Sequence, residues 1–430
     1  MNNEHTIIVS FDAVSSKDLE YLKKLPNFSG VINGGALIKK VETVYPSLTY
    51  PVHVSIVTGK KPINHGIVNN TKLEINNENP NWYWYRKDIK GETLFDLAEK
   101  NNLKTCAILW PVTGKGRIKY NMSEIFCNRP WENQIIKSAV AGSMLYQLNM
   151  SNRFGKFREG LKQPQLDNFA MEVAKATIIE KKPNLMLLHL VDVDTQKHYH
   201  GCNSSEVKEA LLRHERRLGE IINALKEANI YEKSTLILLG DHSQLDTDKL
   251  IRLNSLFVEK ELIKINRKNK VKSYKAITKS CDGSCYVYLK DKSSIREVQE
   301  ILLEEMNKEQ SGIEKIFTRE EAIDLGVDKN CDFIIEAKKG YYFIDDTSGK
   351  TYEKVNKEKI GVIKHRLSAA HGYLPKKEEY STFFIAKGNS IKKGLILENG
   401  QLINHGPTIA EIMGLDLEEA DGVVERRIFK

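Results

Sequence analysis

The stretch LILLGDH, residues 236–242, is an apolar strand-like run that ends in an acid and a histidine. Two other runs have the same form: IIVSF at residues 7–11 precedes Asp12, and LMLLHL at residues 185–190 lies shortly before Asp194. In an open sheet of parallel strands, the loops beyond the carboxyl ends of the strands meet in one crevice. The three runs therefore predict a parallel sheet with polar side chains gathered at one edge.

Apolar, β-branched runs alternate with helical patterns along much of the chain. This alternation predicts an α/β fold with a mostly parallel sheet flanked by helices. The predicted strands cover residues 6–11, 104–109, 184–191, 234–239 and 381–386. The predicted helices cover residues 51–57, 91–101, 166–181, 205–229 and 407–413.

The pattern changes between residues 254 and 365, where short apolar runs flank a single helical stretch. We therefore predict a core made of residues 1–253 and 366–430, with a smaller inserted α+β cap-like subdomain at residues 254–365. A second insertion-like region, residues 111–165, is rich in Gly, Asn, Arg and aromatic residues and has weak periodicity.

The 430 residues are 41% hydrophobic, which is enough for a large core. No run approaches the roughly 18 apolar residues that span a bilayer, and no signal-peptide pattern is present, so we expect a cytoplasmic protein. Its six cysteines are then expected to be reduced thiols. The net charge of +8 comes from interleaved basic and acidic residues without a nucleic-acid-binding signature, and it suits a small anionic substrate. The sequence does not indicate the oligomeric state.

Polar side chains that follow the predicted strands form a candidate set of metal ligands. The set is Asp12, Asp194, His198, Asp241, His242 and His371. One acid after a strand is more often a turn former or helix cap, but several acids with complementary histidines favour a metal site. Oxygen and imidazole donors without a thiolate suit Zn²⁺, with Mn²⁺ or another first-row ion as an alternative. Two such ions about 4 Å apart suit phosphoryl transfer. Asp192 is a competing carboxylate two residues before Asp194.

Thr49 is the candidate nucleophile, and Asn70 is a candidate hydrogen-bond donor to a phosphate oxygen. Tyr50 and Pro51 follow Thr49, and proline is common in the first turn of a helix. The Thr49 hydroxyl is therefore expected at a helix N-terminus, where backbone N–H groups favour a phosphate. The alternatives are a simple helix cap for Thr49 and an ordinary turn residue for Asn70.

Taken together, these residues resemble the alkaline phosphatase superfamily, and most closely its nucleotide pyrophosphatase/phosphodiesterase branch. The segment PSLTYPVH at residues 46–53 resembles the family's nucleophile segment, and Asn70 lies 21 residues after Thr49, as in the family. The resemblance implies that Thr49 attacks phosphorus and forms a covalent intermediate, which water then hydrolyses. It also implies two metal sites: Asp194, His198 and His371 in one, and Asp12, Asp241, His242 and the Thr49 oxygen in the other.

The chain departs from the family pattern at Val52, Lys197 and Ser243-Gln244, and none of these changes removes a ligand. We therefore expect a two-metal phosphodiesterase or nucleotide pyrophosphatase that acts on a small phosphate ester. A phosphonate-bond hydrolase, similar to phosphonoacetate hydrolase, and a phosphomonoesterase of the same superfamily are the alternatives.

A phosphomonoester carries an additional negative charge and would favour additional cations, for which Lys115, Arg117 and Lys197 are candidates. A silent metal-binding or scaffold protein would be expected to lack a ligand or Thr49, and all seven residues are present.

Overall fold

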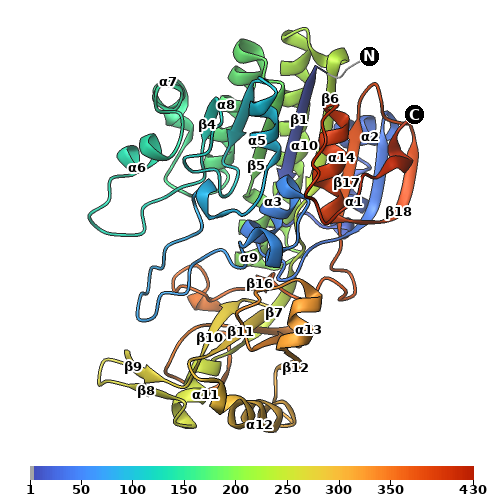
Figure 1. Cartoon of the computed structure of the whole chain (residues 1–430). Helices are drawn as coiled ribbons and strands as arrows, with labels where there is room; N and C mark the ends of the chain where they lie inside the picture. The colour runs from blue at the N-terminus through green and yellow to red at the C-terminus, as the bar shows by residue number, and fades with distance from the viewer. Residues whose placement is uncertain (1–3) are drawn as a thin grey trace.

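An eight-stranded sheet organises the main part of the computed structural model, which describes residues 4–430 (Figure 1). The strand order is β18-β2-β17-β6-β1-β5-β3-β4. Every neighbouring pair is parallel except those of β17, which runs antiparallel to β2 and β6. The strands are β1 (His5–Phe11), β2 (Ala36–Glu42), β3 (Thr105–Ile108), β4 (Tyr120–Met122), β5 (Leu185–Leu190), β6 (Ser234–Gly240), β17 (Thr382–Lys387) and β18 (Leu395–Gln401). The predicted α/β fold with a mostly parallel sheet is confirmed.

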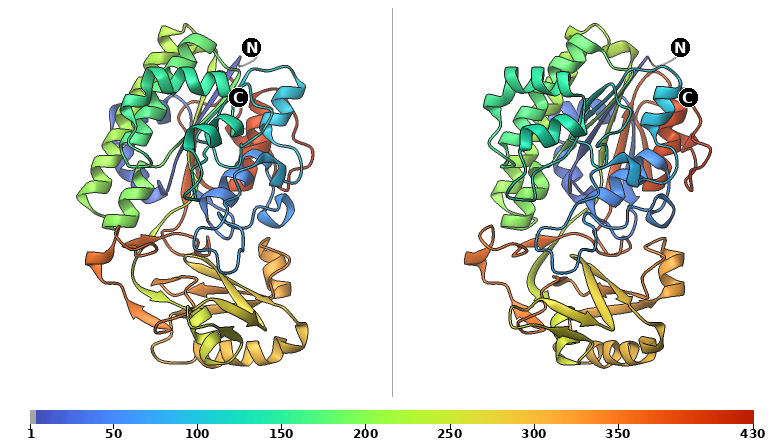
Figure 2. Two further views of the ribbon diagram at one scale, coloured as in Figure 1. Left: turned by 90° about the vertical axis from the view of Figure 1, so that its left-hand side faces the viewer. Right: turned by 60° about the vertical axis from the view of Figure 1, so that its left-hand side comes forward.

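Helices cover both faces of this sheet (Figure 2). One face packs against α1 (Ser16–Leu22), α2 (Pro26–Asn33), α7 (Met144–Phe154), α8 (Gln165–Lys181) and α10 (Ser205–Glu227). The other packs against α3 (Thr49–Thr58), α5 (Leu94–Lys100) and α14 (His405–Ile412). Successive residues of a strand point to opposite faces, so Ile7 and Val9 join the first core and Ile8 joins the second. This double burial explains why the central strands are almost continuously apolar.

The five predicted helices correspond to α3, α5, α8, α10 and α14, and all five predicted strands are present. In the main sheet the prediction missed β4, which has only three residues, and also β2 and β18. Strands β2 and β18 contain exposed or half-buried residues, so neither forms the continuous apolar run that marked the central strands. At the edge of the sheet, β18 needs little apolar sequence, because backbone pairing with β2 places it.

A smaller part lies at the edge of the sheet where β1, β5 and β6 end (Figure 1). It contains a four-stranded antiparallel sheet in the order β10 (Ala276–Cys281), β11 (Ser284–Leu289), β13 (Phe333–Ala337) and β12 (Ile313–Thr318). A second small sheet joins β7 (Leu245–Ile251) to β14 (Gly340–Phe343), β15 (Tyr352–Lys354) and β16 (Ala369–Ala370). The remaining elements of this part are β8 (Ile263–Ile265), β9 (Val271–Tyr274), α11 (Leu253–Glu259), α12 (Ile295–Met306) and α13 (Arg319–Leu325).

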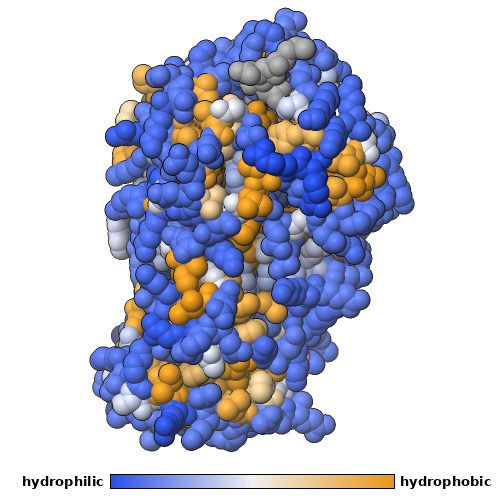
Figure 3. Space-filling model, turned by 45° about the vertical axis from the view of Figure 1, so that its right-hand side comes forward, coloured by the Kyte–Doolittle hydropathy of each residue, from blue (hydrophilic) through white to orange (hydrophobic). Residues whose placement is uncertain are grey.

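The boundary at residue 254 stays a prediction, because β7 begins nine residues earlier and pairs with strands of the smaller part. Three short helices complete the fold: α4 (Pro62–His65), α6 (Gln134–Ala141) and α9 (Asp192–His200). Within residues 4–430, no helix combines the length and the apolar character needed to cross a membrane. The face of the molecule in Figure 3 is mainly hydrophilic, with apolar residues in separate patches.

Two isoleucines in strands of the same sheet give a first test of this packing. Ile237 is fully buried in the central strand β6, whereas Ile396 is 51% exposed in the edge strand β18. We expect Ile237→Ala to lower the free energy of unfolding by about 2–5 kcal/mol and Ile396→Ala by less than about 1 kcal/mol. Urea unfolding followed by circular dichroism measures both values, and equal losses would contradict the placement of β6 at the centre of the sheet.

Candidate metal and phosphate site

Three adjacent strands deliver most of the candidate ligands to one edge of the sheet. Asp12 follows β1, Asp194 lies in the first turn of α9 after β5, and Asp241 and His242 follow β6. Because the order is β5-β1-β6, these side chains meet at the carboxyl ends of neighbouring strands. His371 comes from farther along the chain, directly after β16.

Asp12, Asp241 and His242 form the first candidate group, with ligand atoms within 4.8 Å of one another. His242 Nε2 lies 3.2 Å from Asp241 Oδ2 and 3.4 Å from Asp12 Oδ1. All three residues are buried, and the two carboxylate oxygens Asp12 Oδ1 and Asp241 Oδ2 have no hydrogen-bond partner within the described residues. Buried carboxylates are costly unless a cation or donor compensates them, so these two oxygens fit a metal ion.

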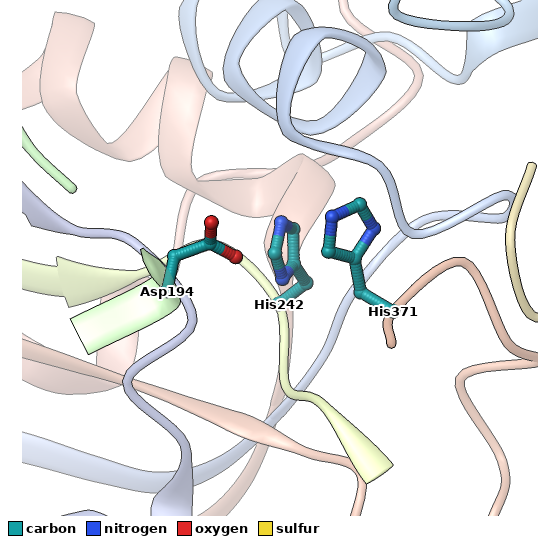
Figure 4. A group of neighbouring side chains, drawn as sticks. All are labelled: Asp194, His242 and His371. Atoms are coloured by element: carbon teal, nitrogen blue, oxygen red, sulfur yellow. The ribbon is translucent and has the colours of Figure 1, made fainter. Parts of the chain in front are cut away.

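Asp194, His242 and His371 form the second group, again within 4.8 Å of one another. Figure 4 shows the carboxylate of Asp194 directed toward His242, with His371 on the other side of that ring. His198 adjoins this group, because its Nε2 lies 3.4 Å from Asp194 Oδ1 and its ring centroid 5.1 Å from that of His371. His371 Nδ1 is buried and has no hydrogen-bond partner within residues 4–430, so this nitrogen is a further candidate metal-ligand atom. His242 thus belongs to both groups and lies between them.

The charges of the site support a cationic occupant. Burial raises the pKa of Asp12 well above its usual value, and the neighbouring Asp241 and Asp194 carboxylates raise it further. An excess of buried negative charge of this kind is what a divalent cation neutralises. The donors are carboxylate oxygens and imidazole nitrogens, a set that suits zinc and other first-row ions, and nothing in the structure distinguishes between these metals.

Thr49 is the first residue of α3, as predicted from Pro51, and its hydroxyl oxygen lies 3.2 Å from His242 Nε2. Asn70 lies beside it, because its side-chain oxygen accepts a hydrogen bond of 2.9 Å from the Tyr50 amide. That bond fixes the plane of the Asn70 side-chain amide. The side-chain nitrogen of Asn70 has no partner within the described chain and can donate to another group. Both residues are therefore placed to contact a group bound next to His242.

Buried residues that the sequence analysis missed hold the first group in place. His189 Nε2 lies 3.0 Å from Asp12 Oδ2, and the Ala13 amide donates a bond of 3.0 Å to Asp241 Oδ1. His53 contacts the Thr49 carbonyl at 2.8 Å through Nδ1 and the Ser10 hydroxyl at 2.9 Å through Nε2. His189 and Ser10 are polar residues in otherwise apolar strands, and that interruption is the signal that could have identified them.

Two of the alternatives raised by the sequence are resolved by contacts. Asp192, the competing carboxylate, pairs with Arg213 at 2.6 Å and Arg217 at 2.9 Å, and these arginines serve as its counter-ions. Lys197 is buried and pairs with Asp18 at 2.6 Å, while it donates to the Ala13 carbonyl at 2.8 Å. Both side chains therefore have structural partners.

One departure from the family pattern does touch a candidate ligand. The Gln244 side-chain nitrogen donates to the Asp194 carboxylate at 2.5 Å and to the Asp194 carbonyl at 3.2 Å. It therefore orients Asp194 at the start of α9.

A cavity of about 940 Å³ opens next to the second group, between the main sheet and the smaller part. Asn70, His198 and His371 line it on one side, and Asp282 and Lys279 of the smaller part line it on the other. Asp282 Oδ2 lies 3.9 Å from His371 Nδ1, so the smaller part brings a carboxylate close to the candidate ligands. The cavity is large enough for a small ester with its leaving group.

The model of a protein family described as type I phosphodiesterase / nucleotide pyrophosphatase matches residues 6–374. Among curated proteins, human ectonucleotide pyrophosphatase/phosphodiesterase family member 1 is 28% identical over 277 residues, 60% of this chain and 26% of that protein. An uncharacterized pyrophosphatase/phosphodiesterase of Schizosaccharomyces pombe is 25% identical over 265 residues, 58% of this chain and 47% of that protein. Venom phosphodiesterase 2 of Crotalus adamanteus is 27% identical over 58% of this chain and 28% of its own length. The chain therefore spans less than half of each of these relatives.

Solved structures share the fold at lower identity. Human ectonucleotide pyrophosphatase/phosphodiesterase 5 superposes with a TM-score of 0.66 and 18% identity, covering 97% of each chain. An inactive form of the murine protein in complex with AMP superposes with a TM-score of 0.68 and 17% identity, covering 99% of this chain and 100% of that chain. The similarity extends over both the main sheet and the smaller part.

The shared position of His242 gives a test of the two groups. We expect the wild-type chain to retain about two zinc ions after reconstitution and dialysis, His371→Ala about one, and His242→Ala fewer still. His200→Ala is the matched control, because this histidine of α9 is partly exposed and lies outside both groups. Elemental analysis measures the metal content, and full retention by both site variants would contradict the assignment.

Proposed function

This chain belongs to the type I phosphodiesterase / nucleotide pyrophosphatase family of the alkaline phosphatase superfamily, and we propose that it hydrolyses phosphodiester or nucleotide pyrophosphate bonds. The observation that supports this proposal most strongly is the position of the Thr49 hydroxyl, 3.2 Å from His242 Nε2. The same nitrogen lies 3.4 Å from Asp12 Oδ1 and 3.2 Å from Asp241 Oδ2, two buried oxygens without a hydrogen-bond partner among residues 4–430. A hydroxyl is a weak nucleophile, and a neighbouring cation site is one way in which proteins activate it.

For the metal ligands we propose the division that the family resemblance implies, with His242 at the boundary between the two sites. Asp12, Asp241, His242 and the Thr49 oxygen would hold one divalent cation, and Asp194, His198 and His371 the other. Bound divalent cations, which we propose to be zinc, supply positive charge that lowers the pKa of the nucleophile and stabilises the oxygens of the transferring group.

Thr49 Oγ1 attacks the phosphorus atom in this proposal. A bond forms between Thr49 Oγ1 and phosphorus, the bond from phosphorus to the leaving oxygen breaks, and the hydroxyl proton is released. Water then attacks phosphorus and frees Thr49 in a second displacement. Asn70 donates a hydrogen bond from its free side-chain nitrogen to a non-bridging oxygen, and the Tyr50 amide holds it in position.

Nucleotide-like diesters are the substrate class we favour. The curated relatives are named as pyrophosphatases and phosphodiesterases, and one structural neighbour is a complex with AMP. The cavity of about 940 Å³ has room for such a group, and Trp82 lies on its wall, where a base could stack.

The carboxylate that the smaller part brings to the candidate ligands favours a monoanionic diester over a dianionic monoester. Of the three cations that a monoester would require, Lys197 is paired with Asp18, and neither Lys115 nor Arg117 lines the cavity. Asp282 adds a carboxylate beside His371, which would repel a second negative charge on the substrate. A phosphonate-bond hydrolase would use the same ligands and nucleophile, so only turnover separates it from the diesterase.

A cytoplasmic location is also a proposal. All six cysteines are free, at positions 106, 127, 202, 281, 285 and 331, which is compatible with a reducing compartment.

Replacing the nucleophile tests the proposed reaction. We expect Thr49→Ala to lower kcat for a chromogenic phosphodiester by about a thousandfold or more while the zinc content stays near that of the wild type. Thr49→Ser keeps a hydroxyl and should restore part of the activity. Thr58→Ala is the control in the same helix, because Thr58 lies at the opposite end of α3 from Thr49, where its hydroxyl donates to the Val54 carbonyl at 2.7 Å and accepts from the Lys60 amide at 3.2 Å.

The same assay compares the diester with the matching monoester and with phosphonoacetate, with metal-stripped and zinc-restored protein. Zinc-dependent preference for the diester is the expected result. Preference for the monoester or the phosphonate would replace the proposed function, and full activity of Thr49→Ala would remove Thr49 from its role.

A charge-neutral variant tests discrimination by the cleft. We expect Asp282→Asn to raise the ratio of monoester to diester kcat/KM on the order of tenfold, because a like charge next to the phosphate is removed. Asp346→Asn is the control, because Asp346 lines the same cavity but pairs with Arg252 at 3.3 Å. An unchanged ratio in Asp282→Asn would show that Asp282 does not select between the two esters.

A further inference from the structure

Exposed apolar side chains are concentrated in one short region of the chain. Half of the eighteen large apolar residues that are exposed among residues 4–430 lie between residues 131 and 161. The densest part is α6, α7 and the residues just before them. It exposes Trp131, Ile135, Ile136, Val140, Met144, Leu145 and Leu148, which we call the hairpin surface. Single exposed apolar residues are ordinary, but seven within eighteen residues indicate a binding surface.

The two helices present these side chains outward. In α7, Tyr146, Gln147 and Met150 are buried, so the helix is held to the core by one face. Met144, Leu145 and Leu148 share the opposite face, because Leu148 lies four positions after Met144 and three after Leu145, and residues at these spacings are neighbours on a helix. Only Gly142 and Ser143 separate α6 from α7, and the two helices contact each other. Figure 2 shows both short helices on the outside of the molecule.

A basic loop adjoins the junction of the two helices. The Lys115 amide donates to the Ala141 carbonyl at 2.6 Å, and the Ser143 hydroxyl donates to the Lys119 carbonyl at 3.0 Å. Lys115, Arg117 and Lys119 are all exposed. None of the three has a carboxylate within 4.0 Å in the described part of the chain. Unpaired cations therefore border the hairpin surface.

The dimensions of the surface are too small for a stable contact with a second copy. With a rise of 1.5 Å per residue and a width of about 10 Å per helix, α6 and α7 present roughly 300 Å². A stable interface between proteins buries about 800 Å² on each partner. A symmetric contact would also bring two unpaired basic loops toward one interface, which is unfavourable.

An anionic lipid surface complements both properties. Apolar side chains on short helices insert at the boundary between headgroups and acyl chains, and neighbouring lysines and arginines contact the lipid phosphates. The aromatic ring of Trp131, 80% exposed, is of the kind that gathers at this boundary. We propose that the hairpin surface docks the protein peripherally on anionic membranes.

The hairpin surface begins close in the sequence to a segment that lines the cleft. Phe126, Cys127 and Asn128 line the cavity, and Trp131 follows three residues later. A membrane that contacts Trp131 would therefore lie near this wall of the cleft. The proposal does not depend on the reaction, because binding to vesicles can be measured without substrate.

Vesicle sedimentation tests the proposal with the full chain. We expect at least about tenfold more protein bound to vesicles of phosphatidylcholine with phosphatidylserine than to vesicles of phosphatidylcholine alone. Ile136→Ser combined with Leu145→Ser should lower binding at least about fivefold. Neutralising the basic loop, with glutamine at positions 115, 117 and 119, should remove the preference for anionic vesicles.

Matched controls come from exposed apolar residues elsewhere. Val423→Ser and Ile396→Ser, which remove 66% and 51% exposed side chains, should leave binding unchanged. Turnover of a soluble diester should be the same in the hairpin variants as in the wild type, which separates this proposal from the proposed function. Equal binding by the hairpin variants and the wild type would overturn the proposal.

Trp131 provides a direct probe of insertion. Trp84 and Trp110 are buried, and Trp82 is partly covered by Tyr50 and Phe126, so Trp131 is the tryptophan that a bilayer can reach. Brominated phosphatidylcholine in anionic vesicles should quench its fluorescence, and Trp131→Phe should remove most of that quenching. Quenching that persists in Trp131→Phe would overturn the proposal. So would sedimentation velocity that shows a lipid-free dimer converted to monomer by the Ile136/Leu145 variant, since a second copy would then occupy the surface.

Discussion

The burial of two carboxylates side by side is the constraint on which the site depends. Asp12 and Asp241 follow β1 and β6, which are neighbours in the sheet. Each has one oxygen held by the protein and one that has no hydrogen-bond partner in the part of the chain that the structure describes. Burying a charge of this kind costs several kcal/mol, on the order of the whole stability of a domain, unless a cation compensates it. The core therefore has to be rigid enough to keep the two oxygens together until a cation binds. The fully buried strands and the support of His189 and the Ala13 amide provide that rigidity.

The smaller part does more than cover the cleft, because it fixes the position of His371. The Gly283 amide donates to the His371 carbonyl at 2.8 Å, and the Gly372 amide donates to the Ser47 carbonyl at 3.1 Å. Gly372 has a φ of +80°, and a Cβ there would lie 1.7 Å from the Cys281 carbonyl oxygen, so only glycine allows the two segments to approach so closely. The ligand farthest along the chain is thus held between the nucleophile segment and the turn that carries Asp282. Changes in the smaller part are expected to reach the metal site through this contact.

The hairpin surface and the cleft have different requirements. The cleft buries charge that the protein's own contacts compensate only in part, whereas the hairpin surface exposes apolar area and cations that have no ion-pair partner among residues 4–430. The region that carries it showed weak periodicity in the sequence, because α6 and α7 are short and only one face of α7 is buried. Peripheral binding at the hairpin surface would bring the cleft of the main part to a lipid surface.

The sequence by itself determined the α/β class, five strands of the main sheet and five of the helices that cover it. It also identified the residues that meet at the site. It could do so because strands buried on both faces must be apolar, and because residues after parallel strands converge. It missed β2 and β18, which backbone pairing places at one side of the sheet, and the short strand β4 at the other edge. It also missed His53 and His189, whose role depends on neighbours distant in the chain. Only the tertiary structure decided that Asp192 pairs with arginines, that Lys197 pairs with Asp18, and that His242 lies between the two groups. Each of these depends on which side chains lie within about 4 Å of one another, and spacing along a chain does not fix such distances.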